Sequence, residues 1–61
     1  MNSELLIHNT LAALKSGHPV EITHHGSEHI VTMTSQGAII NAQGSLITYL
    51  DFFRDIFLMA Q

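Results

Sequence analysis

The chain has 61 residues, of which 46% are hydrophobic and 11% charged, and it contains no cysteine. The lack of cysteine excludes disulfides and thiolate metal sites and fits a reducing cytosol, so we expect a cytoplasmic protein. Two basic and five acidic residues give a formal net charge of −3, which argues against a nucleic-acid partner, because such surfaces need clustered lysine and arginine. A chain this short hides only about 60% of its unfolded surface. We therefore expect one small domain over residues 1–61 that gains stability from a partner subunit.

The first predicted element is a helix over about residues 3–16. Ser3 is a suitable N-cap, and the apolar side chains that follow recur at helical spacing. Gly17 favours the left-handed conformation that ends helices, and Pro19 prevents continuation. The N-terminus lacks the basic segment of a secretory signal, so we expect no leader peptide.

Three strands separated by glycine-containing turns are predicted next. His25-Gly26 suits a two-residue hairpin turn, and Gln36-Gly37 suits a second one. Between and beside these turns the sequence alternates or is rich in β-branched residues, as is typical of strands. The strands are predicted over residues 20–24, 28–35 and 38–42.

The register of this sheet follows if both turns have two residues, because residue 22 then lies opposite 29, and 33 opposite 40. A three-residue first loop would instead pair Ile22 with Ile30, which leaves an alternative register open. With two-residue loops, one face is apolar and is the expected floor for the helices: Val20, Ile22, Val31, Met33, Ile40 and Ala42. The other face is either solvated or a second contact surface: Glu21, Thr23, Ile30, Thr32, Thr34, Ile39 and Asn41.

The last predicted element is a strongly apolar helix over residues 46–60, with Gly44 ending the sheet and Ser45 as N-cap. Its four polar side chains share one stripe about 120° wide, which leaves roughly two thirds of the helix surface apolar. These polar residues are Thr48, Asp51, Arg54 and Asp55. At about 22 Å the helix is too short for a hydrocarbon layer of about 30 Å, so no membrane span is expected.

So much apolar helix surface exceeds what a 61-residue monomer can easily cover, which predicts a homodimer, with a different protein as the alternative partner. The predicted interface anchors are Tyr49, Phe52, Phe53, Ile56, Phe57 and Met59. The predicted fold is α+β, in the order α-β-β-β-α, with two helices packed on one face of a three-stranded antiparallel sheet.

Three of the five histidines, His24, His25 and His29, cluster around the first turn. In the two-residue register His24 and His29 share a face within reach of one divalent metal ion, while His25 points to the other face. Glu28 is the only carboxylate expected nearby. These histidines are candidate metal ligands, but a solvated hairpin tip is the simpler interpretation, and we expect no metal or other cofactor.

No catalytic motif is recognisable. The serines lie at element boundaries, where capping and turn formation explain them, and no glycine-flanked serine elbow or phosphate-binding loop occurs. The pair Asp51 and Asp55 lies on the polar stripe of the last helix, where a solvated face or inter-subunit pairing through Arg54 is expected. The sequence therefore predicts a protein without enzymatic activity.

One segment resembles the Phd/YefM-type antitoxins. Members of that family read Gly-x-Pro-Val-x-Ile-Thr-x-x-Gly after a helix, and this chain reads Gly17-His18-Pro19-Val20-Glu21-Ile22-Thr23-His24-His25-Gly26, with a β-branched strand over residues 31–35. The resemblance covers residues 11–35 and implies a dimeric cytoplasmic protein that binds operator DNA and, through a C-terminal segment, a toxin. The chain departs from the family pattern because it has no strand before its first helix and few basic residues.

The primary hypothesis is thus a non-enzymatic interaction or regulatory protein that dimerises through its last helix. The alternatives are an antitoxin-like transcriptional regulator and a histidine-dependent divalent metal binder.

Overall fold

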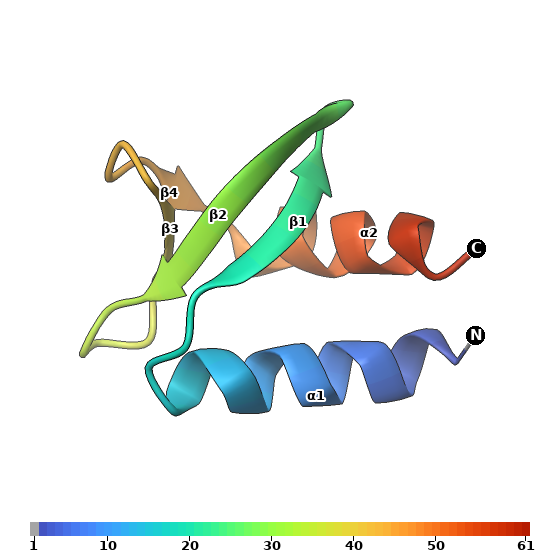
Figure 1. Cartoon of the computed structure of the whole chain (residues 1–61), viewed down its shortest axis with the longest axis horizontal. Coiled ribbons are helices and arrows are strands. Elements are labelled where there is room, and N and C mark those ends of the chain that lie inside the picture. The colour runs from blue at the N-terminus through green and yellow to red at the C-terminus, as the bar shows by residue number, and fades with distance from the viewer. Residues whose placement is uncertain (1) are drawn as a thin grey trace.

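The computed structural model describes residues 2–61, which form two helices and one four-stranded antiparallel sheet. The elements in chain order are α1 (Ser3–Lys15), β1 (Val20–His24), β2 (Ser27–Met33), β3 (Ile39–Asn41), β4 (Leu46–Ile47) and α2 (Tyr49–Met59). Figure 1 shows the helices running side by side in opposite directions against the sheet, whose strand order follows the chain. The α+β class is confirmed, with four strands instead of the three predicted. Met1, which belongs to the single domain predicted over residues 1–61, lies outside the described residues.

Helix α1 begins at Ser3, and its N-cap lies one residue earlier than predicted. Asn2, not Ser3, is the N-cap, and its side chain accepts hydrogen bonds from two amides of the first turn. At the other end the amide of Gly17 donates to the carbonyl of Leu14, and the amide of His18 donates to that of Ala13. These two bonds satisfy carbonyls that the helix leaves free, as in other glycine-terminated helices.

The first hairpin has the predicted register. Ile22 lies opposite His29, and His24 opposite Ser27, which leaves a two-residue turn. Both turn residues, His25 at φ 50° and Gly26 at φ 78°, adopt the left-handed conformation that this tight turn requires. The prediction of a two-residue loop is therefore confirmed.

The second hairpin differs from the prediction by one residue. Met33 pairs with Ile39, because the loop has three residues and is closed by the amide of Thr34, which donates to the carbonyl of Ala38 at 2.8 Å. Gly37 is the last loop residue, where φ is +83°. A shift of one residue exchanges the two faces of a strand. Ile39 is therefore fully buried, and the predicted core position of Ile40 is wrong.

A third hairpin replaces the predicted start of the last helix. The Asn41 side chain accepts hydrogen bonds from the amides of Gln43 and Ser45, and the chain turns back so that Leu46–Ile47 pairs with β3. The prediction of Ala42 in the core is wrong as well, because it lies exposed in this loop. Helix α2 begins at Tyr49 with Thr48 as N-cap, so the predictions of a Ser45 cap and a helix from residue 46 are also wrong.

The core lies between the sheet and the two helices. All six helices and strands contribute to its buried residues: Leu14, Ile22, Val31, Ile39, Ile47, Phe52 and Ile56. The accessible surface of 4156 Å² is close to the roughly 3,900 Å² expected for a folded monomer of this mass. The apolar side chains that remain exposed therefore reflect composition and do not result from loose packing.

Candidate functional site

Helix α2 turns one side toward the sheet and α1 and the other side outward. The inward side buries Phe52, Ile56 and Asp55, and Asp55 as a whole residue is only 4% exposed. The predicted polar stripe is therefore not a solvated face, because Asp55 belongs to the buried side. Only Asp51 and Arg54 of that stripe form a pair at the surface, where Nη2 of Arg54 donates to Oδ1 of Asp51 at 2.8 Å.

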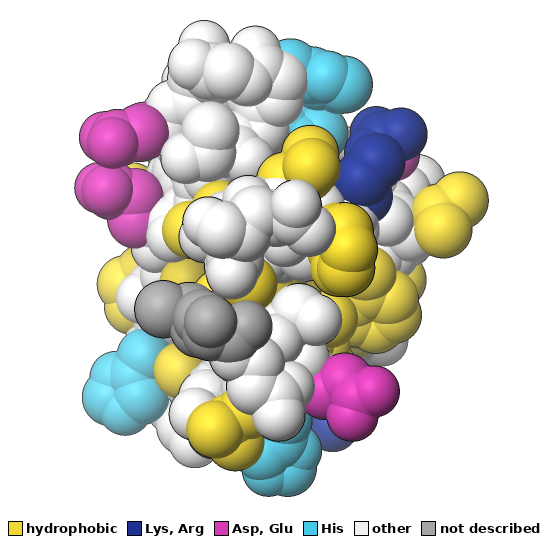
Figure 2. Space-filling view, turned by 90° about the vertical axis from the view of Figure 1, so that its right-hand side faces the viewer, with side chains coloured by type: hydrophobic (Ala, Val, Ile, Leu, Met, Phe, Trp, Pro, Cys, Tyr) yellow, Lys and Arg dark blue, Asp and Glu magenta, His cyan; other side chains and the backbone are white. Residues whose placement is uncertain are grey.

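The outward side of α2 carries an apolar row that we call the outer face of α2: Tyr49, Leu50, Phe53 and Phe57. Leu50 is 79% exposed and Phe57 is 51% exposed, and neighbouring exposed side chains of this size form an apolar patch, which is more informative than a single exposed leucine. The rings of Tyr49 and Phe53 meet edge to face with centroids 5.8 Å apart, so the row is continuous. Figure 2 shows hydrophobic side chains gathered on the right of the view.

The membership of the predicted interface changes. Phe52 and Ile56 are buried within the chain, so their assignment as interface anchors is corrected to core residues. Tyr49, Phe53 and Phe57 are exposed in part and remain available for contact. Whether they form an interface stays a prediction.

Met59 and Tyr49 also have contacts within the chain. The sulfur of Met59 accepts a hydrogen bond from the amide of Thr23 at 3.4 Å, and the hydroxyl of Tyr49 donates to the carbonyl of Gly37. These contacts hold the two ends of α2 against β1 and against the β2–β3 loop. Both residues therefore have a structural role besides the predicted one.

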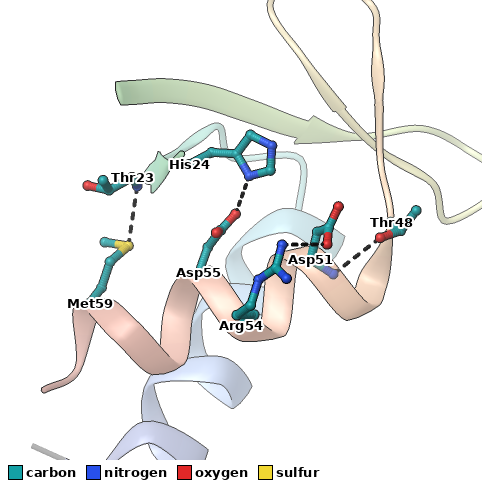
Figure 3. Close-up of polar contacts among 7 residues, drawn as sticks. All are labelled: Thr23, His24, Thr48, Asp51, Arg54, Asp55 and Met59. Carbon is teal, nitrogen blue, oxygen red and sulfur yellow. Dashed lines mark hydrogen bonds and ion pairs between the residues drawn. The ribbon is translucent and has the colours of Figure 1, made fainter. Parts of the chain in front are cut away.

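The buried carboxylate of Asp55 has its partner on β1. Oδ2 of Asp55 lies 2.6 Å from Nδ1 of His24, and their side chains are 6% and 18% exposed (Figure 3). An ionised carboxylate only accepts hydrogen bonds, so Nδ1 carries the proton and donates. The contact joins residues 31 positions apart and fixes α2 relative to the first hairpin.

Sequence reasoning missed this pair because it named Glu28 as the only carboxylate near the histidines. The available signal was the position of Asp55 beside Phe52 and Met59 on the helical wheel, at the edge of the polar stripe. A polar residue at such an edge can turn inward when the opposite strand supplies a partner.

The three candidate histidines gather around His24. Its ring centroid lies 4.1 Å from that of His25 and 5.8 Å from that of His29. The prediction that His25 points to the other face is wrong, because its ring lies against His24. Among residues 2–61, no three histidine, cysteine or acidic side chains are placed to hold one metal ion.

A hollow of about 520 Å³ separates the first hairpin turn from α2. Asp55 and Arg54 line it together with the apolar side chains of Leu58 and Met59, and His25 lines it from the turn. The hydrogen bonds of residues 2–61 include none between a serine or threonine hydroxyl and a histidine. The site therefore offers an oriented imidazole without an activated nucleophile beside it.

Comparison of the chain with protein-family models, with curated proteins and with solved structures finds no match in any of the three. The resemblance of residues 11–35 to the Phd/YefM-type antitoxins stays a prediction. No helix within residues 2–61 combines the length and the apolar character that a membrane crossing needs.

Proposed function

We propose that this protein is a small non-enzymatic interaction protein that acts as a homodimer through the outer face of α2, and that the dimer occupies or adapts another protein. The observation that carries the proposal is the exposure of Leu50 and Phe57 beside Phe53 on one row of α2. Burial of a side chain of this kind that was fully exposed contributes about 1.5–3 kcal/mol. For a domain of this size that is a large share of its stability.

The area of this face suits a dimer. If each whole side chain is taken as about 150–250 Å², the exposed fractions of the four residues leave roughly 400 Å² of apolar surface. A standard interface takes about 800 Å² from each partner, a little over half of it apolar. The pair formed by Arg54 and Asp51 borders the row and supplies the polar rim that such interfaces have.

The row also suits a second copy of the chain. A two-fold axis makes each partner present the same surface, so the surface must complement itself. Phe57 follows Phe53 by four positions, and Leu50 and Tyr49 precede it by three and four. Two antiparallel α2 helices that cross at Phe53 would therefore place each Phe57 against Tyr49 and Leu50 of the other copy.

The alternative functions gain less support. Of the two basic residues, Lys15 lies in the last turn of α1 and Arg54 is engaged by Asp51, so they form no basic patch for DNA. For a metal site, His24 uses Nδ1 for Asp55 and only Nε2 is left as a ligand.

The test is the solution mass, measured by light scattering over about a hundredfold range of protein concentration. The range matters because a dimer dissociates when it is diluted below its dissociation constant. We expect a dimer for the natural chain and a monomer for Phe57→Asp, because a carboxylate within a desolvated contact is left unpaired. Phe57 is exposed, so the variant should keep its helical circular dichroism.

The matched control is Leu46→Asp, which places the same charge on an exposed apolar position of β4, on the face of the sheet that points away from the helices. This variant should remain a dimer. A natural chain that is monomeric throughout the range would refute the proposed homodimer, as would a Phe57→Asp variant of unchanged mass.

A further inference from the structure

The sheet has a second face that neither helix covers. The core residues Ile22, Val31 and Ile39 point toward the helices, so their neighbours in each strand point away. Ile30 is 54% exposed and Leu46 is 66% exposed on this side. We call it the outer sheet face, and its residues are Glu21, Thr23, Glu28, Ile30, Thr32, Ile40 and Leu46.

The register arranges this face into two halves. Ile40 lies between Thr32 on one neighbouring strand and Leu46 on the other, and Ile30 lies diagonally across from Ile40. These three aliphatic side chains therefore form one strip across β2, β3 and β4. Glu21 lies opposite Ile30 on β1, and it continues the face with an acidic half.

Glu28 completes the acidic half, two residues before Ile30 on the same side of β2. The two basic residues of the chain, Lys15 and Arg54, lie in the helices and not on this face. Figure 2 shows acidic side chains together at the upper left of the view, with hydrophobic side chains below them, and a further acidic side chain at the lower right. The outer sheet face thus carries only negative formal charge.

This charge decides between two kinds of occupant. A second copy of the chain would bring the carboxylates of Glu21 and Glu28 close to those of its partner, and like charges in contact disfavour association. A partner with lysine or arginine beside aliphatic side chains complements both halves of the face. We propose that the outer sheet face docks a protein segment of this kind, basic on one side and aliphatic on the other.

The docking surface does not depend on the proposed dimer, because it lies on the opposite side of the chain from the outer face of α2. If the dimer forms, its two outer sheet faces remain free. Two linked or neighbouring basic segments would then bind with an effective concentration that a single chain cannot provide.

The test is an NMR titration of the ¹⁵N-labelled chain with a short synthetic peptide in which lysine alternates with valine, and with the same peptide carrying glutamate in place of lysine. We expect saturable shifts in β1 to β4 with the lysine peptide and none with the glutamate peptide. Glu21→Lys with Glu28→Lys should weaken binding about tenfold or more, because both favourable charge contacts become repulsive.

A matched control separates docking from general attraction to an acidic protein. Glu4→Lys, Asn9→Lys and Gln61→Lys together change the net charge by the same amount at exposed positions outside the sheet. Binding by this variant should stay within about twofold of the natural chain, since such separated charges are screened at physiological salt. Phe57→Asp should bind the lysine peptide as the natural chain does, so a failed dimer would leave this result intact.

Three results would overturn the proposal. The first is equal binding of the two peptides, and the second is an equal loss of affinity in the control variant. The third is a set of shifts that maps to α2 instead of the sheet.

Discussion

Each side of α2 holds an exception to the usual rule of burial. The inward side buries the carboxylate of Asp55, whereas the outward side leaves Leu50 79% exposed. A buried charge is unfavourable unless it is paired, and His24 supplies the pair at 2.6 Å. The difference teaches that a helix with apolar residues on both sides is oriented by its specific partners, because hydrophobicity alone does not choose between the sides.

Phe52 and Ile56 complete this orientation. Both are buried against the sheet and α1, where they fill space that a smaller side chain would leave empty. The outer residues Phe53 and Phe57 have the same chemistry but remain 38% and 51% exposed. The comparison of the two sides can therefore be tested by identical substitutions on each.

The largest expected effect is that of Phe52→Ala. Truncation of a fully buried phenylalanine destabilises a protein by about 3–5 kcal/mol, which is comparable to the whole stability of so small a domain. We expect this variant to be largely unfolded by circular dichroism in urea titrations. The matched variant Phe57→Ala should lose less than about 1 kcal/mol at a concentration low enough to suppress self-association. Equal losses would show that the two sides of α2 do not differ as described.

An intermediate effect is expected for Asp55→Ala, which leaves His24 without its partner in a largely buried position. The loss of a buried hydrogen-bonded group lowers the free energy of unfolding by about 1–3 kcal/mol. Asp51→Ala removes the same side chain from the outward side, where an exposed ion pair contributes about 0–1 kcal/mol. Urea denaturation of both variants at one fixed concentration measures the difference. A loss for Asp51→Ala as large as that for Asp55→Ala would argue against the His24 contact.

The smallest expected effect on folding is that of Leu50→Gln. Leu50 is so exposed that the free energy of unfolding of the isolated chain should change by no more than about 0.5 kcal/mol. The same variant should weaken the proposed dimer, which sedimentation equilibrium would measure. A clear loss of folding stability without any change in association would place Leu50 in the core and not at an interface.

Local sequence was sufficient for the first helix and the first hairpin. Gly17 and Pro19 end α1 near the predicted residue, and His25-Gly26 forms the predicted two-residue turn. In both cases the deciding interactions lie within a few residues of one another, so they can be recognised from the sequence.

The same reasoning failed at the second and third hairpins. A glycine can occupy the second position of a two-residue loop or the third position of a three-residue loop, and Gly37 takes the latter. Asn41 then starts a loop of the same length, which converts Leu46–Ile47 from the expected helix start into β4. The choice depends on which of Ile39 and Ile40 the core accepts, and that is a property of the whole fold.

The candidate surfaces divide in the same way. The sequence by itself determined that the last helix is too apolar to be covered on all sides, because composition and helical periodicity are local properties. Only the tertiary structure decided which side is covered, since Phe52 and Asp55 find their partners on elements far away in the chain. It likewise decided, through the register of β3, that Ile40 joins Ile30 on the outer sheet face while Ile39 enters the core. Long-range packing fixes such choices because each buried position must match a neighbour that the local sequence does not contain.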